Sequence, residues 1–164
     1  MPDLSTMAED PVEDPGDRTE WILRLLYAPN SRGESRPLYG VTRLMKACFL
    51  IERKLDEEFD VETDFEFKPD KYGPFDQGVY VAVEQLEERG LIRDPENGDD
   101  HDTDLFELTD LGRAEAVDLW EDLPEGQQKL IEWVKYEHAM EKLGRLLTYV
   151  YNEYPDMTTK SVLK

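Results

Sequence analysis

Two short stretches of the chain, LEERGLI at residues 86–92 and FELTDLG at residues 106–112, decide the fold. In the first stretch a helical pattern ends at Gly90, a typical C-terminal stop, and an apolar pair that can enter a core follows it. In the second stretch an apolar segment ends at Thr109, which is a favourable N-cap for another helix. We therefore predict a helix, a strand pair and a second helix, in this order.

Outward from these stretches, hydrophobic periodicity predicts more helix than strand. Asp17 and Asp76 are candidate N-caps of two of the helices. Residues 61–67 alternate apolar and polar side chains, which predicts a half-buried strand. The predicted elements are helices from residue 17 and over 41–59, 76–89, 109–123, 125–137 and 139–154, strands over 61–67, 91–93 and 105–108, and loops over 28–37 and 94–104.

Helix, long helix, helix and then a two-stranded hairpin is the order of elements in a winged-helix domain. The predicted fold class is therefore mainly α with a small β component (α+β), as a winged-helix-like domain with extra C-terminal helices. One domain spans residues 17–161. Residues 1–16 hold three prolines and five acids with little periodicity, which predicts a disordered acidic tail.

The composition is strongly acidic. Thirty-nine Asp and Glu residues stand against nineteen Lys and Arg residues, which gives a net charge of −20. Such a chain repels itself unless salt screens it, and this balance is typical of proteins from salt-accumulating halophiles. The sequence holds no apolar run of membrane-spanning length and begins with an acidic stretch, so we expect a cytoplasmic protein with no membrane partner. The single cysteine, Cys48, lies in an apolar helical pattern and is predicted to be buried.

The bases are concentrated in one segment. Residues 18–54 hold eight bases and three acids, a balance of +5, so the rest of the chain carries −25. On the predicted long helix, Arg43, Lys46 and Arg53 lie within about half a turn of arc. Two interpretations follow: a solvated face that pairs with the acidic remainder, or a docking surface for an acidic protein or a nucleic acid.

The stretch KPDKYGPFD at residues 68–76 places a rigid turn between two predicted elements. Gly73 permits a backbone angle that other residues resist, and Pro74 fixes the next one, so both are predicted to be structural. The alternative interpretation adds Lys71 and Tyr72 to a partner-binding surface, because a tyrosine ring can pack while its hydroxyl stays at the surface.

Three motifs carry a family resemblance. The stretch TRLMKACFLI at 42–51, the stretch FEFKPDKYGPF at 65–75 and the pair Leu108-Thr109 resemble the SocA-like antitoxin domain, also called Panacea. The stretch YNEYPDMTTKS at 151–161 is similar to archaeal relatives grouped as YwgA-like. The resemblance implies a protein that acts by binding a toxin or another regulator as its protein partner.

A winged-helix DNA-binding regulator is the alternative. Such a protein would insert helix 76–89 into the groove, and Arg89 and Arg93 would contact the nucleic acid. However, the outward positions of this helix include Glu84 and Glu88, and the following loop is rich in aspartate. Because carboxylates repel phosphates, we rank DNA binding below protein binding and leave the oligomeric state open.

The sequence predicts no enzyme, no cofactor and no metal site. The stretch DDHDTD at residues 99–104 has metal-binding residue types, but it lacks the spacing and the terminal Glu of a calcium loop. The sequence has no Gly-rich phosphate loop, and His138 is expected to be packed or exposed on a helix. The predicted function is a non-enzymatic protein-interaction module, antitoxin-like or regulatory, with Arg43, Lys46, Arg53, Lys71 and Tyr72 as partner-binding residues.

Overall fold

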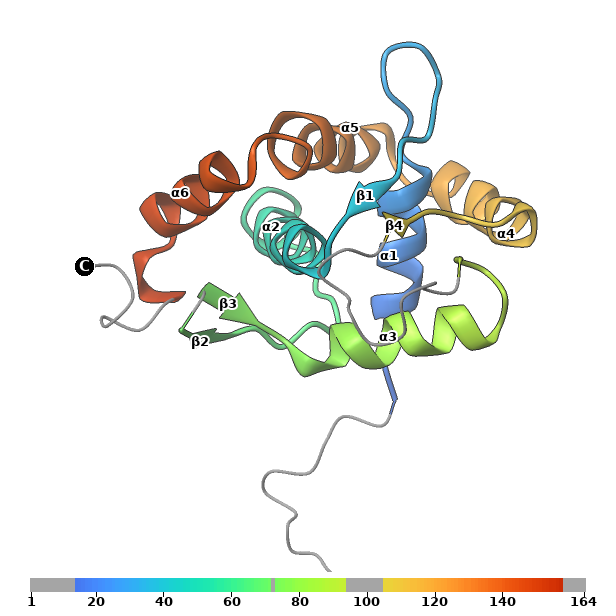
Figure 1. Ribbon diagram of the computed structural model, residues 1–164. Helices are drawn as coiled ribbons and strands as arrows, with labels where there is room; N and C mark the ends of the chain where they lie inside the picture. The colour runs from blue at the N-terminus through green and yellow to red at the C-terminus, as the bar shows by residue number, and fades with distance from the viewer. Residues whose placement is uncertain (1–13, 72, 94–104, 158–164) are drawn as a thin grey trace, which may run out of the picture.

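A long central helix, α2 (Val41–Phe59), organises the fold (Figure 1). The computed structural model describes residues 14–71, 73–93 and 105–157. These residues form a mainly helical domain with two small antiparallel sheets, as predicted for the fold class. Around α2 stand α1 (Arg18–Tyr27), β1 (Leu38–Tyr39), β2 (Lys68–Asp70), β3 (Gly73–Phe75), α3 (Gln77–Glu88), β4 (Leu105–Phe106), α4 (Asp110–Glu121), α5 (Glu125–Trp133), the π-helix η2 (Val134–Ala139), α6 (Leu143–Glu153) and the 3₁₀-helix η3 (Pro155–Met157).

The core forms on the apolar face of α2. Leu44, Phe49, Ile51 and Leu55 on this face are all fully buried. Cys48 is buried among them as predicted, and desolvation raises the pKa of its thiol. Because α5, η2, α6, β3 and β1 all contact α2, this helix is covered on most of its circumference.

The predicted strand pair is confirmed by a bridge between Ile92 and Leu108 and by the amide of Arg93, which donates to the carbonyl of Glu107. A strand that the sequence did not predict, β1, pairs antiparallel with β4. Thr109 caps α4 as expected, since its hydroxyl oxygen accepts from the amide of Gly112 at 3.0 Å. The narrower winged-helix assignment stays a prediction.

The two candidate N-caps behave differently. The carboxylate of Asp76 accepts from the amide of Gly78 at 2.8 Å and caps α3, as predicted. Asp17 occupies the N-cap position of α1, but its carboxylate accepts from the amide of Asp64 at 2.8 Å rather than from the helix. The amide of Asp17 donates back to the carboxylate of Asp64, so this reciprocal pair joins the start of α1 to a distant segment.

The strand predicted over residues 61–67 is wrong. Phe65 is buried and Glu66 is exposed, so the alternation of burial is partly present, but the amides of residues 64–66 bond to side chains instead of to a neighbouring strand. The amide of Asp64 donates to Asp17 and the amide of Glu66 donates to Asp76. The strands lie further along the chain, where β2 pairs antiparallel with β3, and β3 contains Gly73 and Pro74 of the Tyr-Gly-Pro stretch.

The C-terminal helices divide differently from the prediction. The helix expected over 125–137 is an α-helix to Trp133 and continues as the π-helix η2, and α6 begins at Leu143 instead of residue 139. The break falls where the amide of Met140 donates to the carbonyl of Lys135, a five-residue spacing that widens the turn.

Part of the sequence-based prediction lies outside the described residues. This applies to residues 1–13 of the predicted tail, to the acidic loop 94–104 and to Tyr72. Residues 14–16 of the predicted tail are described, and the carbonyl of Pro15 accepts from the amide of Arg18. Within the described ranges, every helix falls short of the length and apolar character needed to span a bilayer.

The close approach of α4 to the 91–93 segment generates the first prediction. A Cβ atom on Gly112 would lie 1.8 Å from the carbonyl oxygen of Leu91, which is rigid backbone, whereas a Cβ atom on Gly144 would have no atom within 4 Å. We expect Gly112→Ala to lower the free energy of unfolding by about 2 kcal/mol or more.

Gly144→Ala is the control, and it should leave the free energy of unfolding unchanged or raise it by about 0.5–1 kcal/mol, because alanine favours helix. Urea denaturation at fixed KCl concentration measures both changes. Equal stabilities for the two variants would contradict the close contact.

Candidate functional site

The Tyr-Gly-Pro turn is held in place from two sides. Gly73 has a φ of +102°, the region that favours glycine, as the sequence predicted. A Cβ atom on Gly73 would lie 3.1 Å from Cε1 of Tyr151 on α6 and 3.4 Å from Cε of Lys46 on α2. The carbonyl of Pro74 accepts a hydrogen bond from Nζ of Lys46 at 3.2 Å. Gly73 and Pro74, which were predicted to form a turn, thus lie in strand β3, and α2 and α6 support them there.

Lys46 is not a surface residue, which corrects the expectation that it belongs to an exposed docking face. Its exposed fraction is 4 %. Desolvation lowers the pKa of its ammonium group to about 8, and the nearby carboxylate of Asp70 partly opposes this shift. Lys46 thus connects α2 to the β2–β3 turn from within the molecule.

Arg43 and Arg53 are also partly covered. The guanidinium group of Arg43 donates to the carbonyls of Tyr39 and Glu141, each at 3.4 Å. The guanidinium group of Arg53 lies 5.0 Å from the ring centre of Phe49 and pairs with Glu52. The prediction that these bases form one exposed face is therefore wrong, because the C-terminal helices and β3 pack against α2 there.

Of the other two predicted partner-binding residues, Lys71 and Tyr72, the structure describes Lys71. Lys71 is exposed at the end of β2, and its amide donates to the carboxylate of Asp70. Tyr72 lies outside the described residues. The turn thus presents one described basic side chain to solvent, while the neighbouring Gly73 and Pro74 are buried.

The two arginines of the DNA-binding alternative are each paired with an acid. Arg89 lies 3.4 Å from a carboxylate oxygen of Glu115, and Arg93 lies 2.8 Å from one of Glu107. Glu84 and Glu88 are exposed on α3, as predicted. A DNA phosphate at this surface would have to displace paired carboxylates and approach unpaired ones, which is electrostatically unfavourable.

The exposed part of the basic segment is the hairpin loop 28–37, which projects from the body of the domain beside α5 (Figure 1). Arg32 and Arg36 are exposed on it, whereas Arg18 and Lys46 are buried and the other bases of the segment are half-buried. A bridge between Pro29 and Ser35 closes the loop. The side-chain oxygen of Asn30 accepts from the amides of Arg32 and Glu34, each at 2.9 Å, so the tip is ordered by its own hydrogen bonds.

Two side chains from η2 anchor this hairpin. Lys135 is fully buried, and its Nζ donates to the carbonyls of Leu26 at 3.0 Å and Ala28 at 3.2 Å. The hydroxyl of Tyr136 also donates to the carbonyl of Ala28, and it accepts from the amide of Arg36. The anchor therefore closes the C-terminal end of α1 and fixes both arms of the hairpin.

Burial, with a smaller contribution from the charges of Arg113 and Arg36, lowers the pKa of Lys135 to about 7. A neutral amine has two N–H donors, and the carbonyls of Leu26 and Ala28 accept both. The hydrogen bonds of the anchor therefore persist when the charge of Lys135 is lost.

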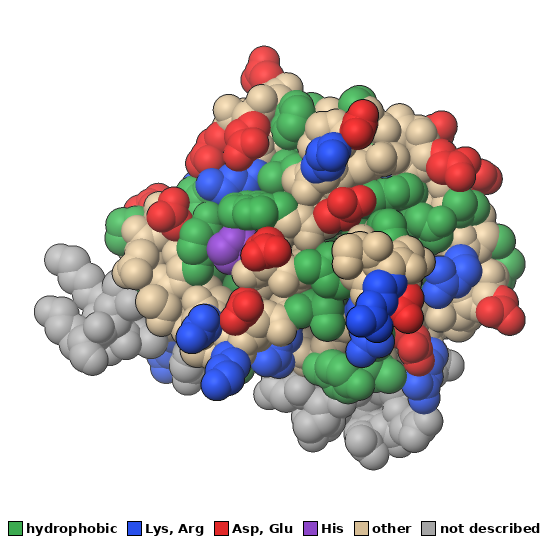
Figure 2. All heavy atoms as spheres, turned by 90° about the horizontal axis from the view of Figure 1, so that it is seen from above, with side chains coloured by type: hydrophobic (Ala, Val, Ile, Leu, Met, Phe, Trp, Pro, Cys, Tyr) green, Lys and Arg blue, Asp and Glu red, His purple; other side chains and the backbone are tan. Residues whose placement is uncertain are grey.

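A shallow groove runs beside the hairpin. It has a volume of about 460 Å³ and is lined by Pro29, Asn30 and Ser31 on one side and by Lys129, Glu132, Trp133, Tyr136 and Glu137 on the other. Figure 2, which views this face, shows basic and acidic side chains interspersed with hydrophobic ones. Trp133 is 36 % exposed, and its ring stands against His138, which in turn packs on Tyr149 of α6.

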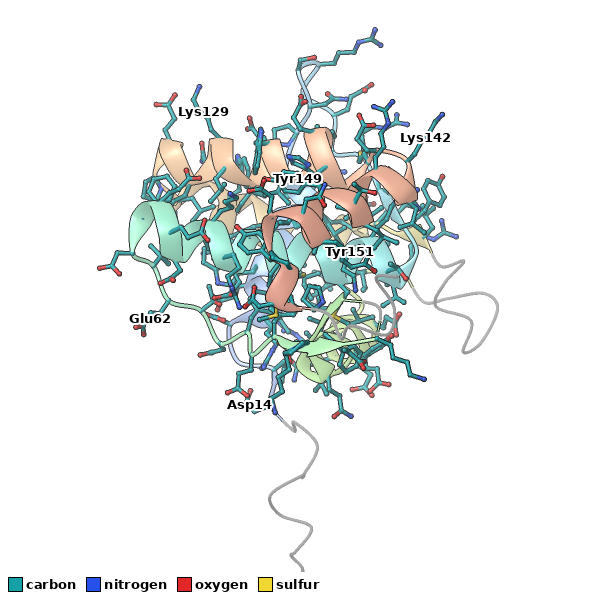
Figure 3. The ribbon with its side chains drawn as sticks, turned by 90° about the vertical axis from the view of Figure 1, so that its left-hand side faces the viewer. Asp14, Glu62, Lys129, Lys142, Tyr149 and Tyr151 are labelled. Atoms are coloured by element: carbon teal, nitrogen blue, oxygen red, sulfur yellow. The ribbon has the colours of Figure 1, made fainter. Side chains whose placement is uncertain are left out.

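The rings of Tyr149 and Tyr151 both come from α6 and reach different neighbours (Figure 3). Tyr149 joins the cluster of Trp133 and His138, and Tyr151 lies against the Tyr-Gly-Pro turn. His138 was expected to be packed or exposed; it is half-buried, and its pKa is lowered chiefly by desolvation.

Sequence patterns did not identify the hairpin and its anchor. The stretch APNSRGESRP was predicted as a loop from its turn residues, and a buried lysine on the C-terminal helix has no sequence signature. One signal in the sequence could have identified the hairpin. Arg32 and Arg36 lie in the one part of the basic segment that has no hydrophobic periodicity.

The chain was compared with protein-family models, with curated proteins and with solved structures, and none of the three comparisons gave a match. Among the residues that the structure describes, no group of three or more His, Cys, Asp or Glu side chains is placed to hold a metal ion. The acidic stretch 99–104 lies outside those residues. The proposed function therefore rests on the geometry of the hairpin and the turn.

The packing of Gly73 generates the second prediction. Gly73→Val adds strain at a positive φ and a clash with Tyr151, whereas Gly33→Val adds strain at a φ of +78° with no atom within 4 Å of the new Cβ. We expect Gly33→Val to lower the free energy of unfolding by about 1–2 kcal/mol and Gly73→Val to lower it by about 1 kcal/mol more.

Thermal and urea denaturation of the two variants measure the difference. An equal loss of stability at both positions would show that the contact with Tyr151 contributes nothing.

Proposed function

We propose that this chain is a cytoplasmic, non-enzymatic protein-interaction module of the antitoxin-like or regulatory kind, and that hairpin 28–37 contacts its protein partner. The observation that carries the proposal is the anchored, projecting form of this hairpin. Its arms are fixed by Lys135 and Tyr136, and its tip is ordered by Asn30. A loop that is ordered before binding loses less conformational entropy in a complex, so more of its contact energy remains as affinity.

The side chains around the hairpin are of the types that dominate protein interfaces. Arg32 and Arg36 are exposed on the hairpin, and Trp133 and Tyr136 line the groove beside it. Tryptophan, tyrosine and arginine are the residues most enriched among those that contribute strongly to binding. The hairpin thus places two positive charges beside the aromatic side chains, while Glu132 and Glu137 make the far side of the groove acidic. This arrangement suits a partner that brings an acidic patch to the hairpin and an apolar centre to the groove.

The resemblance to SocA-like antitoxin domains supports the same class of function. By analogy with those domains, we propose that the Tyr-Gly-Pro stretch positions Lys71 next to the partner. Gly73 and Pro74 would support the backbone at this position. The DNA-binding alternative is less favoured, because Arg89 and Arg93 are each paired with a glutamate.

The third prediction tests the hairpin directly. Arg32→Glu/Arg36→Glu reverses two charges on the hairpin, and Arg89→Glu/Arg93→Glu reverses two charges on the predicted DNA surface with the same change in net charge. We expect the hairpin variant to lose at least tenfold in affinity for the partner, because two favourable charge contacts become repulsive. The Arg89/Arg93 variant should retain its affinity.

The measurement begins with affinity capture from cells of the source in molar KCl, followed by titration of the captured protein against each variant. Circular dichroism checks that both variants fold. Co-expression completes the test, since the captured protein should arrest growth alone and lose this effect beside the wild-type chain if the module is antitoxin-like. Undiminished binding by the hairpin variant, or capture of specific DNA that depends on Arg89 and Arg93, would contradict the proposal.

A further inference from the structure

A second hollow lies on the other side of α2, between the start of this helix and the β2–β3 hairpin. Its volume is about 290 Å³. One wall carries Thr42 and Lys46 from α2, and the opposite wall carries Phe75 and Tyr80. It is separate from the groove beside hairpin 28–37, since the two share no lining residue.

The polar wall is positively charged. Lys46 is 4 % exposed, and its ammonium group, which has three N–H donors, gives one hydrogen bond to the described part of the chain, to the carbonyl of Pro74. A buried cation with unused donors is costly unless an acceptor reaches it. A negatively charged ligand in the hollow would supply that acceptor.

The start of α2 strengthens this preference. The N-cap residue is Gly40, which offers no side chain to the first turn, and the first turn contains no acidic residue. The amides of the first turn have no acceptor within the helix, and their dipoles favour negative charge. Because Val41 and Thr42 also line the hollow, the first turn of α2 and Lys46 border the same space.

The remaining walls define the rest of the ligand. Met45, Phe75 and Tyr80 give an apolar lining, with the rings of Phe75 and Tyr80 5.8 Å apart. The volume lies near the lower end of the range for small-molecule sites, so the apolar body must be compact. The exposed carboxylate of Asp70 lies at the edge of the hollow and disfavours a second negative charge on the ligand.

We propose that this hollow binds a small organic monoanion, a carboxylate attached to a compact apolar or aromatic body. The carboxylate lies against Lys46 and the first turn of α2, and the body lies against Phe75 and Tyr80. Since Lys46 and Gly73 belong both to the hollow and to the support of the Tyr-Gly-Pro turn, occupancy of the hollow stabilises the turn in its present form.

The fourth prediction uses benzoate as the probe, with benzylamine as a cation of similar shape and phenyl phosphate as a dianion. Titration of the ¹⁵N-labelled full chain, followed by amide chemical shifts at constant KCl, should place benzoate at Val41, Thr42 and Gly73. Benzoate should bind at least tenfold more tightly than either control compound. Equal or tighter binding of benzylamine or phenyl phosphate would overturn the assignment of a carboxylate site.

Two variants separate binding from folding. Thr42→Glu puts a negative charge at the first turn of α2, where it favours the helix, so it should maintain the melting temperature and weaken benzoate binding at least tenfold. Thr148→Glu, at an exposed position on α6, makes the same substitution away from the hollow and should leave binding unchanged. Lys46→Met should also abolish binding.

Unchanged affinity in Thr42→Glu, or no benzoate-dependent shift in the wild-type chain, would refute the proposal. The site does not depend on hairpin 28–37. The Arg32→Glu/Arg36→Glu variant should therefore bind benzoate normally, and the two proposals can fail separately.

Discussion

A buried ion pair between Arg18 and Asp76 is the constraint on which the rest of the structure depends. Nε of Arg18 lies 2.8 Å from Oδ2 of Asp76, and both side chains are almost completely buried. The same carboxylate caps α3 through the amide of Gly78 and accepts from the amide of Glu66, and Arg18 also donates to the carbonyl of Pro15. A Cβ atom on Gly78 would lie 2.3 Å from Cζ of Arg18, so glycine is needed for the pair to form.

This pair determines where the surfaces of the two proposals lie. By fixing the ends of segment 66–76 it positions β2 and β3 beside α2, where Lys46 reaches the carbonyl of Pro74 and the small hollow forms. A second buried base, Lys135, has the corresponding role for hairpin 28–37 at the other end of α1. In a chain with a net charge of −20, three buried bases hold elements together, whereas most exposed charges contribute little to stability.

The sequence predicted the helical part of the fold well because local signals specify it. The caps at Asp76 and Thr109, the stop at Gly90 and the apolar face of α2 were all predicted and are present. Segment 61–67 was predicted as a strand because its apolar and polar residues alternate, and this alternation does follow the burial of the side chains in part. However, the amides of Asp64 and Glu66 bond to Asp17 and Asp76, which lie in other parts of the sequence. The alternation alone could not reveal these partners.

The candidate site was predicted less well, for a related reason. Charge counts located the basic segment, but they do not distinguish a buried lysine that donates to a carbonyl from an exposed one. Lys46 and Lys135 are buried because a specific backbone acceptor lies within reach, and that depends on tertiary structure. The positive φ of Gly73 was predicted, because glycine signals it locally, whereas the pairing of Gly73 and Pro74 with β2 was not.

A double-mutant cycle on the buried pair tests the central claim most directly. Arg18→Met and Asp76→Asn each leave one partner buried without its counter-charge or full set of hydrogen bonds, so each should lower the free energy of unfolding by about 3 kcal/mol or more. The double variant should be less destabilised than the sum of the two by about 2 kcal/mol, measured by urea denaturation at fixed KCl concentration. Additive losses to within about 0.5 kcal/mol would contradict the account, because they would show that the two side chains do not act as a pair.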